Sequence, residues 1–115
     1  MIENLEPNAD APVIAVRGNG PLSGTVVVPG AKNSVLKLMA ATLLCDGTFE
    51  ITNVPAIADV TIMGDLLEAI GVEIQRPSPD RLLVTDTGDL TPIAPYELVE
   101  RIRASINVLG PLLAR

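Results

Sequence analysis

Two polar segments of this chain hold the residue types that can bind an anion. The first is the pair Lys32 and Asn33, which follows a Pro-Gly turn and opens a long apolar stretch. If that stretch is a helix, both side chains stand beside unpaired backbone N–H groups at the positive end of its dipole, where a phosphate or carboxylate is favoured. The alternative is that Asn33 or Ser34 caps the helix and that Lys32 is an ordinary solvated residue.

The second polar segment lies near the end of the chain. Glu100, Arg103 and Asn107 are spaced by three and four residues, so on one continuous helix they share a line and can face a ligand together. A planar guanidinium suits a carboxylate or phosphate because it donates two parallel hydrogen bonds. The residues alone equally allow a solvated face with a weak pair between Glu100 and Arg103.

Composition excludes several other kinds of chemistry. The 115 residues include no histidine and one cysteine, so the chain cannot by itself assemble a zinc site, a disulfide framework or a Ser-His-Asp triad. Cys45 ends the apolar stretch, where the helix dipole does not acidify a thiol, and we interpret it as a packing residue. We therefore expect neither a metal nor a cofactor, and chemistry limited to Lys, Arg, Asp, Glu and amide groups.

The charge balance narrows the choice of partners. A formal net charge of −6 and only two aromatic residues, Phe49 and Tyr96, argue against a nucleic-acid partner. The first residues are polar and acidic, unlike a signal peptide, and no apolar run approaches the length of a membrane span. We expect a cytoplasmic protein with no membrane partner.

The elements that must position these side chains follow from periodicity and turn residues. After a polar, flexible start at 1–12, two β-branched runs at 13–17 and 25–28 predict an N-terminal hairpin over 13–29. A helix apolar on nearly every side is expected at 31–45, and a strand at 48–52. An amphipathic helix follows at 59–70, with Asp59 as its possible cap and Gly71 just past its end. Two further strands, 72–75 and 81–85, flank the turn Pro77-Ser78-Pro79-Asp80 and close a helix-strand-helix-hairpin unit.

A third helix is expected from Pro95 onwards. Its apolar positions recur every three or four residues, and Pro111 predicts a kink because its ring crowds the carbonyl of Asn107. The positions in question are Leu98, Ile102, Ile106, Leu109 and Leu113.

Three motifs, taken in order, resemble the N-terminal part of the UDP-N-acetylglucosamine 1-carboxyvinyltransferases, a group within the enolpyruvyl transferase family. The resemblance runs from about residue 13 to 115. It rests on Pro29-Gly30-Ala31-Lys32-Asn33, on Ile51-Thr52-Asn53-Val54-Pro55, and on Arg103-Ala104-Ser105-Ile106 with Leu109-Gly110-Pro111-Leu112.

This resemblance implies transfer of the enolpyruvyl group of phosphoenolpyruvate to UDP-N-acetylglucosamine, the first committed step of peptidoglycan synthesis. It implies that Lys32 and Asn33 contact phosphoenolpyruvate and that Arg103 contacts the sugar nucleotide. It assigns nothing to Asn107, where relatives often carry a different, sometimes aromatic, side chain. A helix start with a lysine can hold a phosphate and stabilise its charge as it leaves, in agreement with these implied roles.

The same resemblance implies an α/β (α+β) fold, the inside-out α/β barrel of that family, of which this chain holds a part. That part is the N-terminal hairpin, which packs with the second domain in the family, one repeat, and the first helix of the next repeat. Residues 30–115 are then an incomplete first domain. The proton donor is expected beyond Arg115, since Cys45 does not match it, and we expect the chain alone to be inactive without the remainder of its enzyme.

Two other functions remain open from the sequence. One is a related 3-phosphoshikimate 1-carboxyvinyltransferase, although those enzymes typically carry a serine after the lysine and an arginine soon after, where this chain has Asn33 and Lys37. The other is a non-catalytic module that binds anions or a partner.

Overall fold

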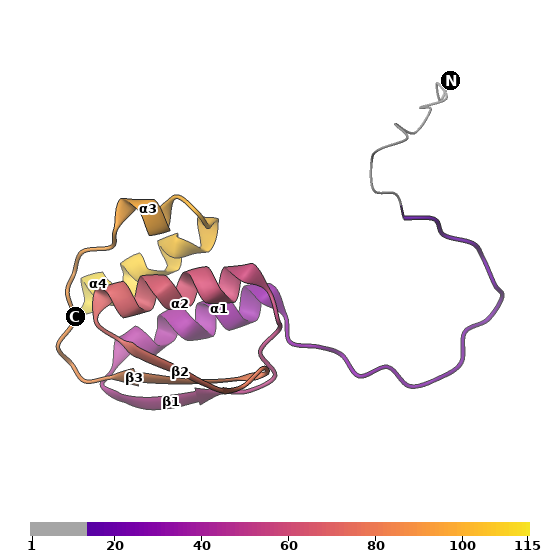
Figure 1. The fold of residues 1–115 in the computed structure, drawn as a ribbon, viewed down its shortest axis with the longest axis horizontal. Helices are drawn as coiled ribbons and strands as arrows, with labels where there is room; N and C mark the ends of the chain where they lie inside the picture. The colour runs from indigo at the N-terminus through magenta and orange to yellow at the C-terminus, as the bar shows by residue number, and fades with distance from the viewer. Residues whose placement is uncertain (1–13) are drawn as a thin grey trace, which may run out of the picture.

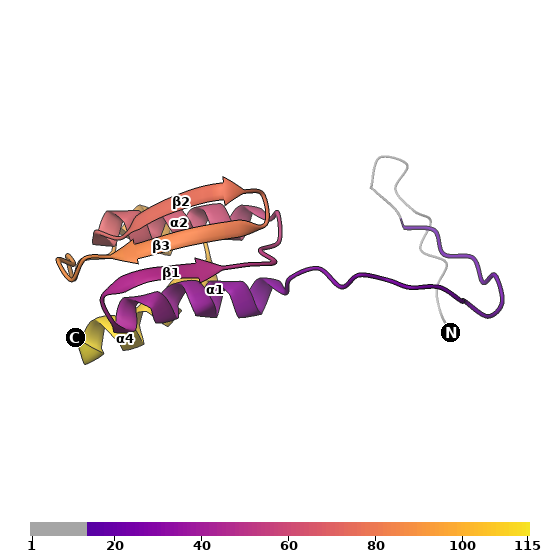
Figure 2. The same cartoon turned by 90° about the horizontal axis from the view of Figure 1, so that it is seen from below.

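The computed structural model describes residues 14–115, so the flexible start expected at 1–12 lies outside the described residues. Figure 1 shows three layers: a small sheet, the helices α1 and α2 packed on one face of it, and a C-terminal layer on the far side of those helices. Figure 2 shows the sheet from its open face. The elements in order are α1 (Lys32–Ala41), η1 (Thr42–Leu44), β1 (Gly47–Ile51), α2 (Ala58–Ile70), β2 (Glu73–Ser78), β3 (Arg81–Asp86), α3 (Tyr96–Val99), η2 (Arg103–Val108) and α4 (Leu109–Ala114).

The sheet has the strand order β1-β3-β2, and both neighbouring pairs are antiparallel. β1 and β2 are therefore parallel to each other, joined through α2, with β3 between them. Side chains alternate along β3, and its inward positions are Leu82, Val84 and Asp86. The helix-strand-helix-hairpin order and the α/β class expected from the sequence are confirmed.

Helix α1 is shorter and less evenly buried than its sequence predicted. It buries Val35, Leu36, Met39 and Ala40, but Leu38 on the opposite side is 54% exposed. Its last turn tightens into the 3-10 helix η1, where the Thr42 hydroxyl donates to the Met39 carbonyl at 2.7 Å. One side of α1 therefore has no cover within the described chain.

Helix α2 begins one residue before the predicted range of 59–70 and ends at the predicted residue. Its buried stripe includes Met63, Leu66, Leu67 and Ile70. It stops at Gly71, whose φ of 115° is a left-handed conformation that a residue with a Cβ rarely adopts. At the other end the N-cap position is Ile57, so the expectation that Asp59 caps this helix is wrong.

The predicted third helix is broken, not kinked at Pro111. The short α3 ends at Val99, Ile102 is extended, and η2 runs into α4. Pro111 lies in the first turn of α4, where no N–H is needed, while its ring disfavours an α-helical turn immediately before it. The break rests on Ser105, whose buried hydroxyl approaches the carbonyls of Val99 at 2.9 Å and Ile102 at 2.7 Å.

The N-terminal hairpin predicted over 13–29 is absent from the residues that the structure describes. Residues 14–28 contain no strand, and their apolar side chains, such as Ile14 and Val27, are almost fully exposed. A strand forms when its backbone finds a partner edge and its side chains find a surface, and this segment has neither within residues 14–115. The expected packing of this segment on a second domain stays a prediction.

Candidate functional site

The N-terminus of α1 is free of any side-chain cap. Its N-cap residue is Ala31, which makes no capping bond, so the interpretation of Asn33 or Ser34 as a cap is wrong. The first bond at this end runs from the Val35 N–H to the Ala31 carbonyl at 3.1 Å. The N–H groups of residues 32–34 therefore have no acceptor inside the helix, and the positive end of the dipole is open to an anion.

The turn that leads into α1 is held against a second segment of the chain. A Cβ added to Gly30 would lie 1.7 Å from the Asn53 carbonyl oxygen, so only glycine permits this approach. Asn53 itself has a φ of 55°, and the neighbouring Val54 N–H donates to the Asp80 carbonyl at 2.8 Å. The Pro-Gly turn and the loop between β1 and α2 thus fix the start of α1 together.

The structure brings Lys32, Asn33 and Arg103 to one groove. Two adjoining cavities, with volumes of about 370 Å³ and 290 Å³, share Asn33, Leu36, Arg103 and Ala104 among their linings. We call their union the α1–η2 groove. Its complete lining is Lys32, Asn33, Leu36, Lys37, Asp59, Ile62, Arg101, Ile102, Arg103, Ala104, Ile106 and Asn107.

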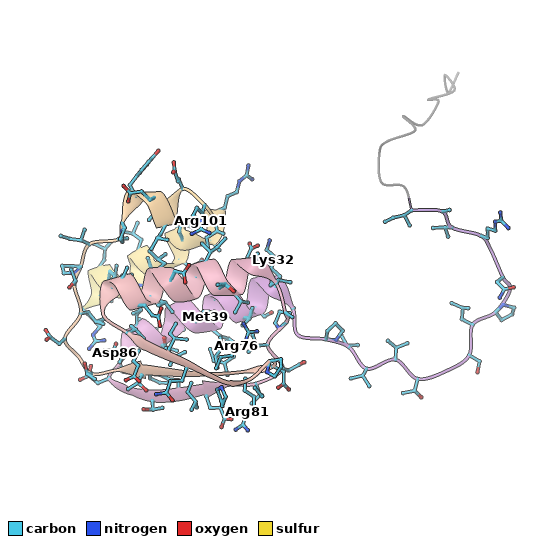
Figure 3. The ribbon with its side chains drawn as sticks, in the orientation of Figure 1. Lys32, Met39, Arg76, Arg81, Asp86 and Arg101 are labelled. Atoms are coloured by element: carbon cyan, nitrogen blue, oxygen red, sulfur yellow. The ribbon has the colours of Figure 1, made fainter. Side chains whose placement is uncertain are left out.

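The groove is positively charged although the whole chain is acidic. Four cationic side chains and a single carboxylate, Asp59, line it. The Lys32 Nζ lies 2.7 Å from Asp59 Oδ2, and the Arg101 guanidinium lies 3.9 Å from Asp65, outside the groove lining. Within residues 14–115 neither Lys37 nor Arg103 forms an ion pair, so both remain able to meet an anionic ligand. Figure 3 shows Lys32 at one end of the helices and Arg101 in the C-terminal layer above them.

The second predicted cluster is only partly brought together. Arg103 and Asn107 both line the smaller cavity of the groove, whereas Glu100 is at the end of α3 and lines neither cavity. Glu100, Arg103 and Asn107 would share one face only on a continuous helix. The extended backbone at Ile102 interrupts the helix between Glu100 and Arg103. Arg103 reaches the groove because η2 packs against α1.

The sequence interpretation missed an ionic cluster at the other end of the molecule. The Arg115 guanidinium contacts Asp86, whose side chain is fully buried, and also Asp46 and the Leu43 carbonyl. Partial burial opposes its charge, yet Asp86 and Asp46 outweigh that effect and raise the pKa of Arg115 above its ordinary value. A charged residue at an inward position of a strand was the available signal.

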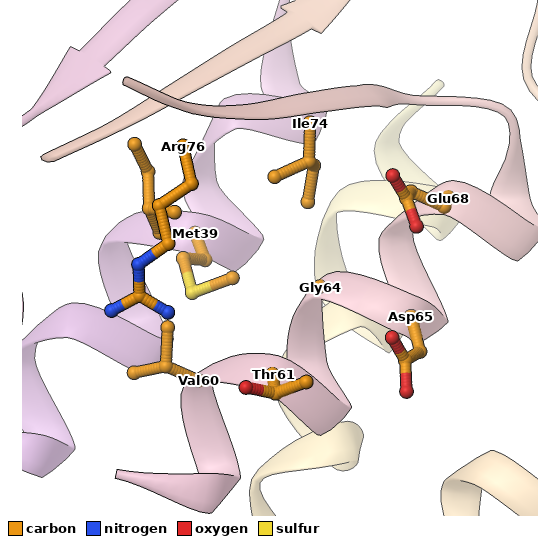
Figure 4. Close-up of a pocket in the computed structure, with 9 residues that line it drawn as sticks. Met39, Val60, Thr61, Gly64, Asp65, Glu68, Ile74 and Arg76 are labelled. Carbon is orange, nitrogen blue, oxygen red and sulfur yellow. The ribbon is translucent and has the colours of Figure 1, made fainter. Parts of the chain in front are cut away.

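A smaller cavity of about 150 Å³ lies between α2 and β2, shown in Figure 4. Arg76 reaches over Met39 and Val60 on one side of it, and Asp65 and Glu68 line the other. None of the site residues predicted from the sequence lies there, and the Arg76 guanidinium donates to the Pro79 carbonyl at 2.7 Å. The α1–η2 groove is therefore the better candidate site.

Known proteins resemble this chain over most of its length. Residues 16–115 match the model of the EPSP synthase (3-phosphoshikimate 1-carboxyvinyltransferase) family. The chain is 48% identical over 103 residues to the UDP-N-acetylglucosamine 1-carboxyvinyltransferase of Jannaschia sp. (strain CCS1), covering 89% of this chain and 24% of that protein. It is 50% identical over 99 residues to the protein of that name from Hyphomonas neptunium, covering 85% of this chain and 23% of that protein. The chain thus spans about a quarter of the length of these relatives.

A solved structure supports the fold independently. The crystal structure of the enolpyruvyl transferase NikO from Streptomyces tendae superimposes with a TM-score of 0.67 at 28% identity, covering 80% of this chain and 21% of that chain. The partial enolpyruvyl-transferase-like α/β fold expected from the sequence is therefore confirmed. In residues 14–115 no helix is long and apolar enough to cross a membrane.

Proposed function

This chain belongs to the EPSP synthase (3-phosphoshikimate 1-carboxyvinyltransferase) family, and we propose that it forms the N-terminal part of a UDP-N-acetylglucosamine 1-carboxyvinyltransferase. Such an enzyme moves the enolpyruvyl group of phosphoenolpyruvate to the sugar nucleotide and releases phosphate, a cytoplasmic step of peptidoglycan synthesis. The observation that carries the proposal is the α1–η2 groove, where the open N-terminus of α1 faces Arg103. The names of the curated relatives support the choice of acceptor.

Each groove residue has a separate role in this proposal. Lys32 and the free N–H groups of the first turn of α1 bind the phosphate of phosphoenolpyruvate and stabilise the charge that grows as the phosphate leaves. The Asn33 amide donates to the same substrate. Arg103, which has no carboxylate partner in the described chain, clamps the sugar nucleotide with its planar guanidinium.

The remaining parts of the reaction are assigned outside this chain. We place the proton donor beyond Arg115, because Cys45 is exposed at the far end of α1 and lines neither cavity of the groove. Residues 30–115 are then an incomplete first domain that needs the remainder of the enzyme to close over the substrates. The isolated chain is expected to release no phosphate from phosphoenolpyruvate.

The test is phosphate release by the complete enzyme with phosphoenolpyruvate and UDP-N-acetylglucosamine. Lys32→Ala is expected to reduce kcat/KM for phosphoenolpyruvate by roughly 100-fold, the scale of losing one preorganised charge at a transition state, while leaving the melting temperature nearly unchanged. Arg81→Ala is the charge-matched control, since Arg81 pairs with Glu50 on the sheet and lies well away from Lys32 in Figure 3. An unchanged rate for Lys32→Ala would reject the anion role.

One alternative acceptor has an observation in its favour. The family model carries the name 3-phosphoshikimate 1-carboxyvinyltransferase, so 3-phosphoshikimate is assayed beside the sugar nucleotide. Turnover with 3-phosphoshikimate alone would replace the proposed acceptor. Binding of phosphoenolpyruvate by the complete protein, with no release of its phosphate in the presence of either acceptor, would instead indicate a non-catalytic anion-binding module.

A further inference from the structure

Asp59 is the only carboxylate among the residues that line the α1–η2 groove. It lies in the first turn of α2, and its Oδ2 is 2.7 Å from the Lys32 Nζ in the first turn of α1. The Asp59 side chain is 26% exposed, against 55% for Lys32. The more buried partner of this pair is therefore the acid and not the base.

A carboxylate in an anion-binding groove opposes the ligand electrostatically, so its presence there calls for a compensating role. An exposed ion pair contributes little to stability, and Asp59 makes no capping bond to its own helix. The contact restricts the conformational freedom of the Lys32 side chain, which has four rotatable bonds and no other ion-pair partner in the described chain.

We propose that Asp59 is a positioning residue, which holds the Lys32 ammonium at the mouth of the groove so that its remaining N–H donors point at the phosphate of the ligand. This inference rests on the proposed function, because it assigns Asp59 to the same phosphoenolpyruvate site. An ammonium has three donors, so a lysine that pairs with Asp59 still has donors left for an anion. The anion therefore meets a lysine whose orientation is already set, and less conformational freedom is lost on binding.

The experiment is a double-mutant cycle in the complete enzyme: Asp59→Asn, Lys32→Ala and the double variant. Asp59→Asn is expected to raise KM for phosphoenolpyruvate by about 10-fold or more, the scale expected when a binding group is misplaced. In the Lys32→Ala background the same change is expected to have almost no effect, since Asp59 acts through that lysine. Asp59→Glu keeps the carboxylate and is expected to recover part of the loss.

A matched control separates position from charge. Glu68→Gln removes one negative charge from the same helix at an exposed site outside the groove, and it is expected to leave both kcat and KM unchanged. An unchanged or lower KM for Asp59→Asn would overturn the proposal and leave Asp59 as a mere counter-charge. An equal loss in the presence and absence of Lys32 would overturn it as well.

The two proposals fail in different ways. If the unsubstituted enzyme releases no phosphate with either acceptor, the proposed function is wrong. The role of Asp59 is then still tested by calorimetric binding of phosphoenolpyruvate to the unsubstituted protein, the two single variants and the double variant. A binding cycle with strong coupling between Asp59 and Lys32 supports positioning. Additive effects, or no binding by the unsubstituted protein, refute it.

Discussion

Gly30→Ala tests whether the turn before α1 is fixed by its contact with the β1–α2 loop. The added Cβ would lie 1.7 Å from the Asn53 carbonyl oxygen and 3.1 Å from Pro55 Cδ. Side-chain carbons essentially never come closer than 3.0 Å to such atoms, so the two backbones must separate by at least 3.0 − 1.7 = 1.3 Å. Asn53 cannot easily yield, because Val54 is hydrogen-bonded to Asp80.

The strain is therefore relieved on the Gly30 side. Overpacking a well-packed contact costs about 1–3 kcal/mol. The lower end applies here, since residues 14–28 are exposed and can move with the turn. The same movement carries the start of α1 with it, and a displacement of about 1 Å at a binding group can reduce a rate by roughly 100-fold. We thus expect a loss of activity that exceeds the loss of stability.

Two measurements check this expectation. With a urea m value of about 1–3 kcal/mol/M, a loss near 1 kcal/mol lowers the unfolding midpoint of the chain by roughly 0.3–1 M. The complete enzyme carrying Gly30→Ala is expected to lose most of its phosphate release. The control is Gly110→Ala in α4, where a Cβ meets nothing within 4 Å and a stabilisation of about 0.5–1 kcal/mol is expected. Wild-type stability and rate for Gly30→Ala would refute the reasoning.

Two further predictions concern charged groups remote from the groove. Arg115→Ala is expected to lower the urea midpoint clearly more than Asp46→Ala does. The reason is that loss of Arg115 leaves the fully buried Asp86 carboxylate without a cation, whereas Asp46 is largely exposed. Equal shifts of the midpoint would contradict this role of Arg115. At the β2–β3 turn, a 2.7 Å hydrogen bond from the Ser78 hydroxyl holds the pKa of Asp80 below its ordinary value, with smaller contributions from a backbone N–H and from Arg81. Ser78→Ala is therefore expected to raise that pKa in a carboxyl NMR titration. Because the folded pKa is the lower one, the contact stabilises the fold at neutral pH, and its contribution disappears as the pH falls through that value; an unmoved titration in Ser78→Ala would assign the shift elsewhere.

Periodicity predicted the central repeat well because each of its elements is stabilised by one buried face. The stripe of α2 and the alternation of β3 are direct consequences of that burial. The hairpin before Gly30 failed for the opposite reason, since β-branched residues such as Val26 favour a strand only where an edge is available. Local sequence specifies these segments only when the partner surface lies within the same chain.

The third helix failed because its apolar spacing was taken as the decisive signal. Ile106, Leu109 and Leu113 fit a continuous helical stripe, but the structure exposes all three. Ile102 is a predicted position that is buried, and it is joined by Ser105 and Val108, which the predicted stripe did not include. A hydrophobicity pattern does not select Ser105 because its side chain is polar. Ser105 donates to the carbonyls of Val99 and Ile102, where the helix is interrupted. This role of Ser105 could not be predicted without knowing that the helix is interrupted there.

For the candidate site, too, the sequence pattern predicted the residue types but not the contacts between them. The residue types at Lys32 and Asn33 indicated an anion site, and the structure places them in one groove with Arg103 although the helix that was to align the arginine does not exist. Asp59 was interpreted as a cap because acids are common at helix starts, and that rule hid its contact with Lys32.

The position of the groove depends on contacts between helix starts and loops more than on the helices themselves. The contact of Gly30 with Asn53 joins the start of α1 to the loop before α2, and the pair of Lys32 with Asp59 joins it to the first turn of α2. On the other side, the break at Ile102 turns η2 towards α1 and so presents Arg103 to the same groove. Each of these features lies where regular secondary structure is absent or interrupted: Gly30 in a turn, Lys32 at a helix start with no side-chain cap, and Ile102 at the break between α3 and η2. A substitution that disturbs one of these contacts is therefore expected to weaken ligand binding more than it lowers the stability of the hydrophobic core.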